Sequence, residues 1–158
     1  MSDLRQLLAG LAGLDGIAGP DGAATSPRLV AVGWATVDIE RTLADLPGVD
    51  AVPAAQDELL GARAWRTTSG PVTTVLLEPT TEGRLAAALA RRGEGIAALY
   101  LRSDEPMVGV RDGTLRPTAL GVPGRLLDQP HPWGPFVVEL SSSAPDGASS
   151  PGRGGHRP

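Results

Sequence analysis

Residues 72–102 place a strand, a helix and a second strand in close succession, and this order limits the possible folds more than any other part of the sequence. Residues 72–77 are rich in β-branched and apolar side chains and predict a strand. Residues 80–92 predict a helix, because its leucines share one face and Gly93 follows as a C-terminal stop. Residues 96–101 are mostly apolar again, and together with Arg102 they predict the next strand.

The flanking sequence extends this pattern into two units. The first unit has the order β-α-β-β-β, with a strand at 28–38, a helix at 39–46 and strands at 49–53, 62–68 and 72–77. The second unit has strands at 96–102, 115–120, 125–128 and 136–140. Its helix is expected to be eroded, because Pro106, Gly109 and Gly113 follow the first strand and disfavour a helix.

The two ends of the chain differ in composition from this central part. Residues 2–14 predict a short amphipathic helix, and 16–27 have the composition of a linker. The helix could pack on its own domain or contact a partner. The tail is rich in Ser, Gly and Pro and is expected to be disordered. The predicted divisions are therefore a helix and linker at 1–27, a folded domain at 28–140 and a tail at 141–158.

Composition excludes several kinds of chemistry. The 158 residues suit one folded domain, and no apolar run is long enough to span a membrane. The chain contains no Cys and no Lys, which excludes thiolate and Schiff-base chemistry, and His131 and His156 are its only histidines. The net charge of -4, without a basic cluster, argues against nucleic acid. A cytoplasmic protein is the expectation.

Two motifs resemble a known family. Val75-Leu76-Leu77-Glu78-Pro79, followed by Arg92-Gly93-Glu94-Gly95-Ile96, resembles the middle of a methylmalonyl-CoA epimerase, a member of the vicinal oxygen chelate superfamily of glyoxalases and bleomycin-resistance proteins. The resemblance covers about 28–140. It implies an α+β fold, in which paired βαβββ modules form a curved mixed sheet around a cavity, with the second module eroded.

The same resemblance assigns the positions of the family's metal ligands. Motif matching places them at Ala31, Val75, Ala98 and Glu139. Three of these side chains are apolar and cannot coordinate a divalent ion. The resemblance therefore implies that no metal and no other cofactor is bound.

The alternation of side chains along strands predicts what lines the cavity. If Ala98 points inward, small or apolar groups surround a few polar side chains, which resembles a small-molecule pocket. The predicted catalytic residues are Glu139, Tyr100 and Arg102, and the predicted substrate-binding residues are Ala31, Gly33, Thr73, Val75, Ala98 and His131. Simpler roles remain open: Glu139 and Arg102 could form a cavity salt bridge, and Tyr100 could be a core residue.

Three functions are consistent with these residues. The first is a metal-independent enzyme that isomerises, epimerises, cyclises or dehydrates an acyl or polyketide-like substrate, with Glu139 as the acid or base. The second is a non-catalytic protein that binds or sequesters a small molecule. The third is a scaffold in which the N-terminal helix docks on another protein. A homodimer is expected, because a partner subunit could cover the eroded module.

Overall fold

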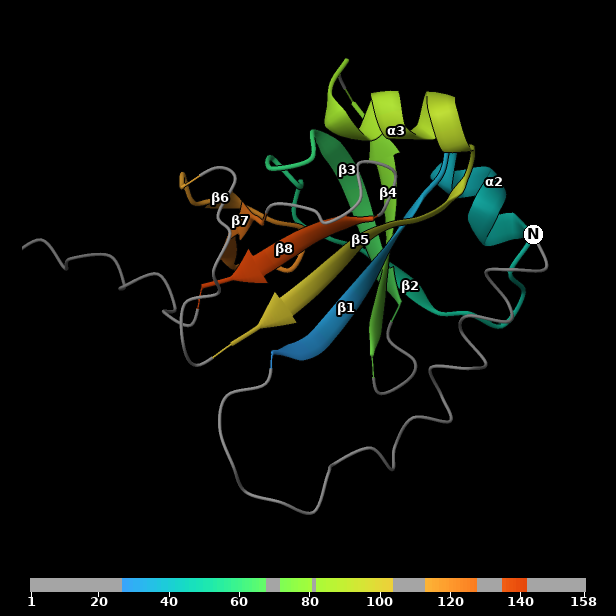
Figure 1. Cartoon of the computed structure of the whole chain (residues 1–158). Coiled ribbons are helices and arrows are strands. Elements are labelled where there is room, and N and C mark those ends of the chain that lie inside the picture. Colours follow the sequence, from blue (N-terminus) through green and yellow to red (C-terminus); the bar gives the residue numbers. More distant parts are fainter. Residues whose placement is uncertain (1–26, 68–71, 81, 104–112, 128–134, 142–158) are drawn as a thin grey trace, which may run out of the picture.

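The computed structural model describes residues 27–67, 72–80, 82–103, 113–127 and 135–141. These residues form one strongly curved sheet with two helices against it (Figure 1). The predicted N-terminal helix, the tail and His131 lie outside the described residues.

The first module follows the predicted order. Its elements are β1 (Arg28–Ala35), α2 (Ile39–Ala44), β2 (Ala51–Pro53), β3 (Ala62–Thr67) and β4 (Thr73–Pro79). The helix α3 (Arg84–Arg92) leads to the second module, which contains β5 (Gly95–Arg102), β6 (Arg116–Pro117), β7 (Pro123–Leu126) and β8 (Phe136–Leu140). Between β5 and β6 the structure describes residue 103 and residues 113–115 but not 104–112. The described residues of this connection contain no helix.

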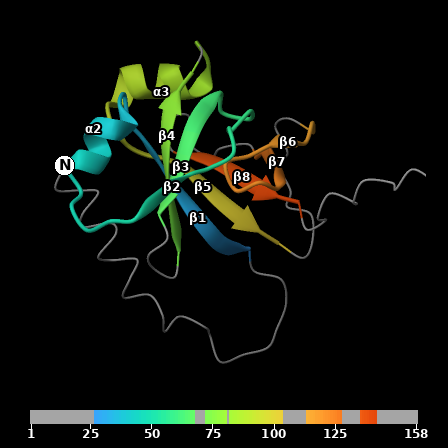
Figure 2. The same cartoon turned by 180° about the vertical axis from the view of Figure 1, so that it is seen from behind.

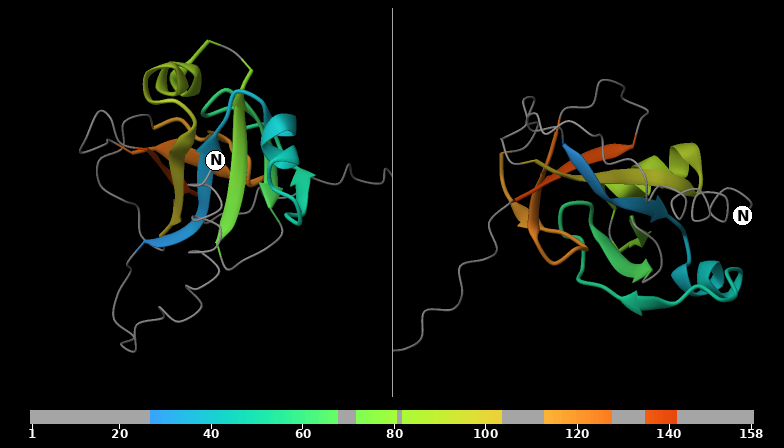
Figure 3. Two further views of the ribbon diagram at one scale, coloured as in Figure 1. Left: turned by 90° about the vertical axis from the view of Figure 1, so that its right-hand side faces the viewer. Right: turned by 90° about the horizontal axis from the view of Figure 1, so that it is seen from below.

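The eight strands form a mixed sheet in the order β2-β3-β4-β1-β5-β8-β7-β6. Within each module the first and last strands are parallel neighbours, and β1 pairs with β5 in antiparallel fashion to join the modules. Figures 2 and 3 show how the sheet curls from β2 at one edge to β6 and β7 at the other. The predicted fold class, an α+β protein with paired modules and a curved mixed sheet, is confirmed.

The helix α2 covers the outer, convex face of the first module. It begins at Ile39 because the Asp38 side chain caps it, accepting a hydrogen bond from the Arg41 backbone N–H at 2.9 Å. Its apolar side packs on the outer face of the sheet, in a cluster that contains Trp34, Ile39, Leu46 and Leu76. This packing leaves the concave face free of α2.

The helix α3 closes one end of the sheet. Leu85, Ala88 and Leu89 form its buried side, and it ends at Gly93, as predicted, where a positive φ of 75° favours glycine. Among the described helices, including α3, none is long and apolar enough to cross a bilayer.

The Glu94 carboxylate fastens α2 to the start of β5. Its Oε1 accepts hydrogen bonds from the Thr36 hydroxyl at 2.8 Å and the Val37 backbone N–H at 3.0 Å, and it forms an ion pair with Arg41. Partial burial opposes ionisation, but these hydrogen bonds and the Arg41 charge outweigh it and lower the pKa of Glu94 below its ordinary value of 4.5.

We therefore expect Glu94→Gln to make the protein less dependent on pH in acid. A lowered pKa gives a stabilisation that is present above the ordinary pKa and is lost as the pH falls through the folded-state value. Urea unfolding from pH 7 to pH 3 should show the wild type losing its advantage over the variant below about pH 4.5. A difference in stability between wild type and Glu94→Gln that stays constant from pH 7 to pH 3 would contradict the lowered pKa of Glu94.

Candidate functional site

Most of the residues predicted to bind substrate meet on the concave face of the sheet. Gly33 in β1 lies beside Val75 in β4 and opposite Ala98 in β5. Ala31 lies beside Thr73 in the next row of the sheet. Ala31, Val75 and Ala98 are completely buried, and only Thr73 is partly exposed.

The space above Gly33 is filled. A methyl group placed on Gly33 would lie 2.8 Å from the Ala98 Cβ, 2.8 Å from the Leu77 Cδ1 and 3.3 Å from the Tyr100 ring. Distances below 3.0 Å are closer than real Cβ atoms approach their neighbours. The centre of the concave face is therefore packed side chain against side chain.

The two modules are related by a local two-fold axis between β1 and β5. Ala31 is opposite Tyr100, and Gly33 is opposite Ala98. A half-turn about the midpoint therefore exchanges Ala31 with Ala98, and Gly33 with Tyr100. The same rotation exchanges β4 with β8, since each is the parallel neighbour of its module's first strand.

This symmetry places the fourth position of the site at Val138. Gly33 lies beside Val75, and Tyr100 lies beside Val138, so Val138 is the equivalent of Val75. The sequence expectation had put Glu139 at this position on the cavity face. That placement is wrong, because Glu139 is one residue further along β8 and neighbouring residues of a strand point to opposite faces.

The Glu139 side chain is buried on the outer face instead. It lies beside Leu101 in β5, and its Oε2 accepts a hydrogen bond from the Arg125 Nε at 2.7 Å. The alternative role, a salt bridge between Glu139 and Arg102, is also wrong, since Arg102 lies beside Leu140 on the concave side. Sequence reasoning missed Arg125, whose partner becomes evident only from the β7–β8 register.

The principal buried polar group on the concave face is a pair that joins Tyr100 to Asp57. The Tyr100 hydroxyl donates a hydrogen bond of 2.7 Å to the Asp57 Oδ2, and both residues are fully buried. The same oxygen accepts the Ala119 backbone N–H at 3.1 Å, and the Oδ1 accepts that of Leu60 at 2.9 Å. Asp57 thus ties the loop before β3 to β5 and to the second module.

Burial alters the ionisation of both groups. It is the largest influence on the Asp57 carboxyl and raises its pKa, although the hydrogen bonds from Tyr100, Ala119 and Leu60 act in the opposite direction. Burial also raises the pKa of the Tyr100 phenol well above its usual value, and the nearby charge of Asp57 adds to this effect. The phenol therefore remains a hydrogen-bond donor at neutral pH.

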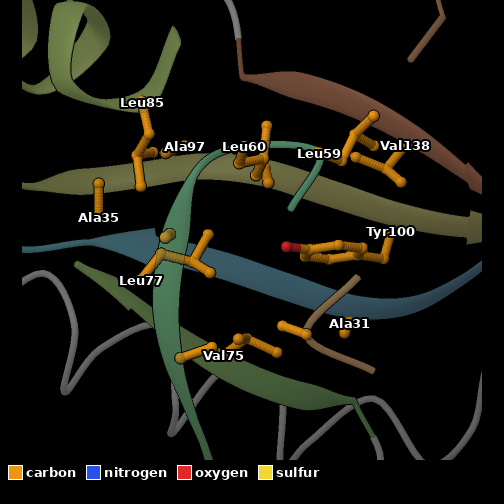
Figure 4. Packing of buried hydrophobic residues seen from close by; sticks show 14 of the residues in the cluster. Ala31, Ala35, Leu59, Leu60, Val75, Leu77, Leu85, Ala97, Tyr100 and Val138 are labelled. Atoms are coloured by element: carbon orange, nitrogen blue, oxygen red, sulfur yellow. The ribbon is translucent and has the colours of Figure 1, made fainter. Parts of the chain in front are cut away.

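The loop that carries Asp57 covers the concave face. Figure 4 shows the segment with Leu59 and Leu60 crossing the sheet, with the Tyr100 ring reaching toward it from β5. Sequence reasoning missed Asp57. The available signal was Asp57-Glu58-Leu59-Leu60-Gly61, a tight turn in which the Gly61 N–H bonds to the Asp57 carbonyl at 2.8 Å and Gly61 has a φ of 71°.

The four symmetry-related positions do not fit a metal ion. Ala31, Val75, Ala98 and Val138 carry hydrocarbon side chains that offer no lone pair. Elsewhere in the described part of the chain, no group of three or more His, Cys, Asp or Glu side chains could hold a metal.

Several solved structures are similar to this chain in architecture. A hypothetical protein from Bacillus halodurans aligns with a TM-score of 0.61 at 18% identity, over 78% of this chain and 99% of the other. A Streptomyces coelicolor methylmalonyl-CoA epimerase in complex with 2-nitronate-propionyl-CoA aligns with a TM-score of 0.59 at 23% identity, over 74% and 98%. The methylmalonyl-CoA epimerase from Mycobacterium tuberculosis aligns with a TM-score of 0.60 at 20% identity, over 73% of this chain and 88% of the other.

The chain has the vicinal oxygen chelate fold. At these identities the comparisons establish the fold and not the activity. No protein-family model matches the sequence, and a search of curated proteins gives no match.

Proposed function

We propose that this protein binds a small acyl or polyketide-like ligand without a metal ion. The acyl class is supported by the shared fold, since solved methylmalonyl-CoA epimerases of similar architecture hold 2-nitronate-propionyl-CoA or methylmalonyl-CoA. Metal independence is supported by the hydrocarbon side chains at Ala31, Val75, Ala98 and Val138, which cannot replace the ligands of the family.

The packing around Asp57 and Tyr100 favours binding without turnover. Proton transfer requires a group within hydrogen-bond reach of the substrate. Both oxygens of the Asp57 carboxylate are already occupied by donors, and Leu59 and Leu60 belong to the core cluster that surrounds Tyr100. A ligand would have to displace this cluster to reach either group, so we infer that the ligand is bound and released unchanged.

Acid–base catalysis is the second candidate, and the raised pKa of Asp57 favours it. A buried carboxyl beside a neutral phenol is a pairing that can move a proton or donate hydrogen bonds to an oxyanion. This function requires the segment with Leu59 and Leu60 to open. Glu139, the base expected from the sequence, is less suitable because it pairs with Arg125 on the outer face.

A titration in heavy water separates the two candidates. We expect propionyl-CoA to change the tryptophan fluorescence in a saturable way, equally with and without EDTA, while its α-carbon takes up no deuterium by NMR. Free coenzyme A, which lacks the acyl group, is the control ligand and should bind more weakly.

Each other outcome has a defined meaning. Deuterium uptake by the wild type that is lost in Asp57→Asn would favour acid–base catalysis, the second candidate, over binding without turnover. Binding that disappears in EDTA would overturn metal independence. Failure of both propionyl-CoA and a longer acyl-CoA to bind would overturn the proposal.

A further inference from the structure

Two arginines face each other at the end of the sheet that lies away from α3. Arg28 is the first residue of β1, Arg102 is the last residue of β5, and the two are direct cross-strand partners (Figure 1). Strand alternation puts Arg102 on the same side as Tyr100 and Ala98, which is the concave face. The arginine pair therefore stands at the rim of the candidate site.

Like charges directly opposite each other destabilise a sheet unless an opposite charge compensates them. Three other arginines have such compensation, because Arg41, Arg63 and Arg125 pair with glutamates. Within the described part of the chain, no ion pair or hydrogen bond is found for the guanidinium of Arg28 or Arg102. Among the described residues, therefore, no carboxylate compensates the two positive charges at the rim.

One donor of this pair is also buried. The Arg102 Nε is shielded from solvent, and none of the described residues offers it a hydrogen-bond acceptor. A buried donor that has no acceptor destabilises the folded state, and more so when it is charged. A guanidinium offers two parallel N–H groups that match the spacing of carboxylate or phosphate oxygens. A bound oxyanion would accept a hydrogen bond from the Arg102 Nε–H and would also neutralise the charge of the two arginines.

We propose that Arg28 and Arg102 form an anion-binding site for a carboxylate or phosphate group of the ligand. This inference deepens the proposed function, on which it rests for the acyl part of the ligand. The anionic group binds at the rim, and the packed centre of the concave face stays closed. An acyl-CoA would present a phosphate, and a free organic acid would present a carboxylate.

Thermal shift and calorimetry on the full-length protein test the site, with sodium phosphate and sodium propionate as separate probes and chloride at equal ionic strength as the reference. We expect one probe or both to bind saturably, and Arg102→Gln and Arg28→Gln to weaken that binding on the order of tenfold or more. Arg92→Gln on α3 removes the same charge at the opposite end of the sheet and should leave binding unchanged. Arg102→Lys, which keeps the charge without the planar fork, should bind at an intermediate level.

The choice of probe identifies the source of the anion, because phosphate alone indicates a coenzyme A or phosphoester and propionate alone indicates an organic acid. The inference is overturned if neither probe binds saturably, or if Arg92→Gln weakens binding as much as Arg102→Gln does. Propionyl-CoA binding that is unaffected by Arg102→Gln would leave the proposed function standing and overturn the arginine site. If phosphate or propionate binds but no acyl-CoA does, the arginine site stands and the proposed function is overturned.

Discussion

Asp57→Ala is expected to lower the free energy of unfolding on the order of 3–5 kcal/mol, because it leaves several buried donors without an acceptor. Those donors are the Tyr100 hydroxyl and the backbone N–H groups of Leu60 and Ala119. Urea unfolding at pH 7 measures the loss. Glu58→Ala changes the neighbouring exposed residue and should stay within about 0.5 kcal/mol of the wild type.

Tyr100→Phe removes only one of these hydrogen bonds, so we expect a smaller loss of about 1.5–3 kcal/mol. The double variant should lose less than the sum of the two single variants, because the residues share the bond. Equal stability of Asp57→Ala and Glu58→Ala would show that Asp57 does not hold the loop on the sheet.

Asp57→Asn tests the direction of the pKa shift. A carboxyl whose pKa is raised by folding contributes stability that is fully present below its ordinary pKa of 3.8 and declines as the pH rises through the folded-state value. The stability of the wild type relative to Asp57→Asn should therefore fall with rising pH. This trend is opposite to the one expected for Glu94→Gln, so the two variants control for each other.

The sequence allowed the elements and their order to be predicted because each has a local cause. Apolar residues dominate the long strands, α2 ends at Ala44 shortly before Pro47-Gly48, and Gly93 caps α3. Gly33, Val75 and Ala98 lie side by side in the sheet because the strands that carry them are neighbours at its centre.

The face of β8 could not be predicted by the same reasoning. Alternation in Phe136-Val137-Val138-Glu139-Leu140 groups Phe136, Val138 and Leu140 on one side and Val137 with Glu139 on the other, but it does not tell which side faces the inside of the curved sheet. Only the pairing of Tyr100 with Val138 fixes the register, and a shift of one residue reverses every side chain. The motif match to Glu139 carried no information on that register.

The role of Asp57 was hidden for a different reason. Its partners Tyr100 and Ala119 are 43 and 62 positions away in the sequence. A single acidic residue in a loop is normally exposed, and the turn signal at 57–61 does not by itself indicate that the Asp57 carboxylate is buried. Such a tertiary contact becomes visible only after both modules have been assembled.

Gly33→Val is the second variant with a large expected effect, because it tests whether the concave face is packed or open. Its Cβ would lie 2.8 Å from the Ala98 Cβ, which is fixed to the backbone of β5 and cannot rotate away. The strands would have to separate, and overpacking of this kind costs about 1–3 kcal/mol or more. We therefore expect a loss of about 3 kcal/mol in urea unfolding at pH 7.

Gly113→Val is the matched control, because a Cβ at Gly113 would meet nothing within 4 Å and its backbone needs no positive φ. Adding Ala98→Gly to Gly33→Val should restore part of the lost stability, since it removes the Ala98 Cβ that the new side chain would clash with. A Gly33→Val protein as stable as the Gly113→Val control would mean that the concave face has room at its centre. Such room would let a ligand approach Tyr100 and would shift the balance from binding alone toward acid–base catalysis at Asp57.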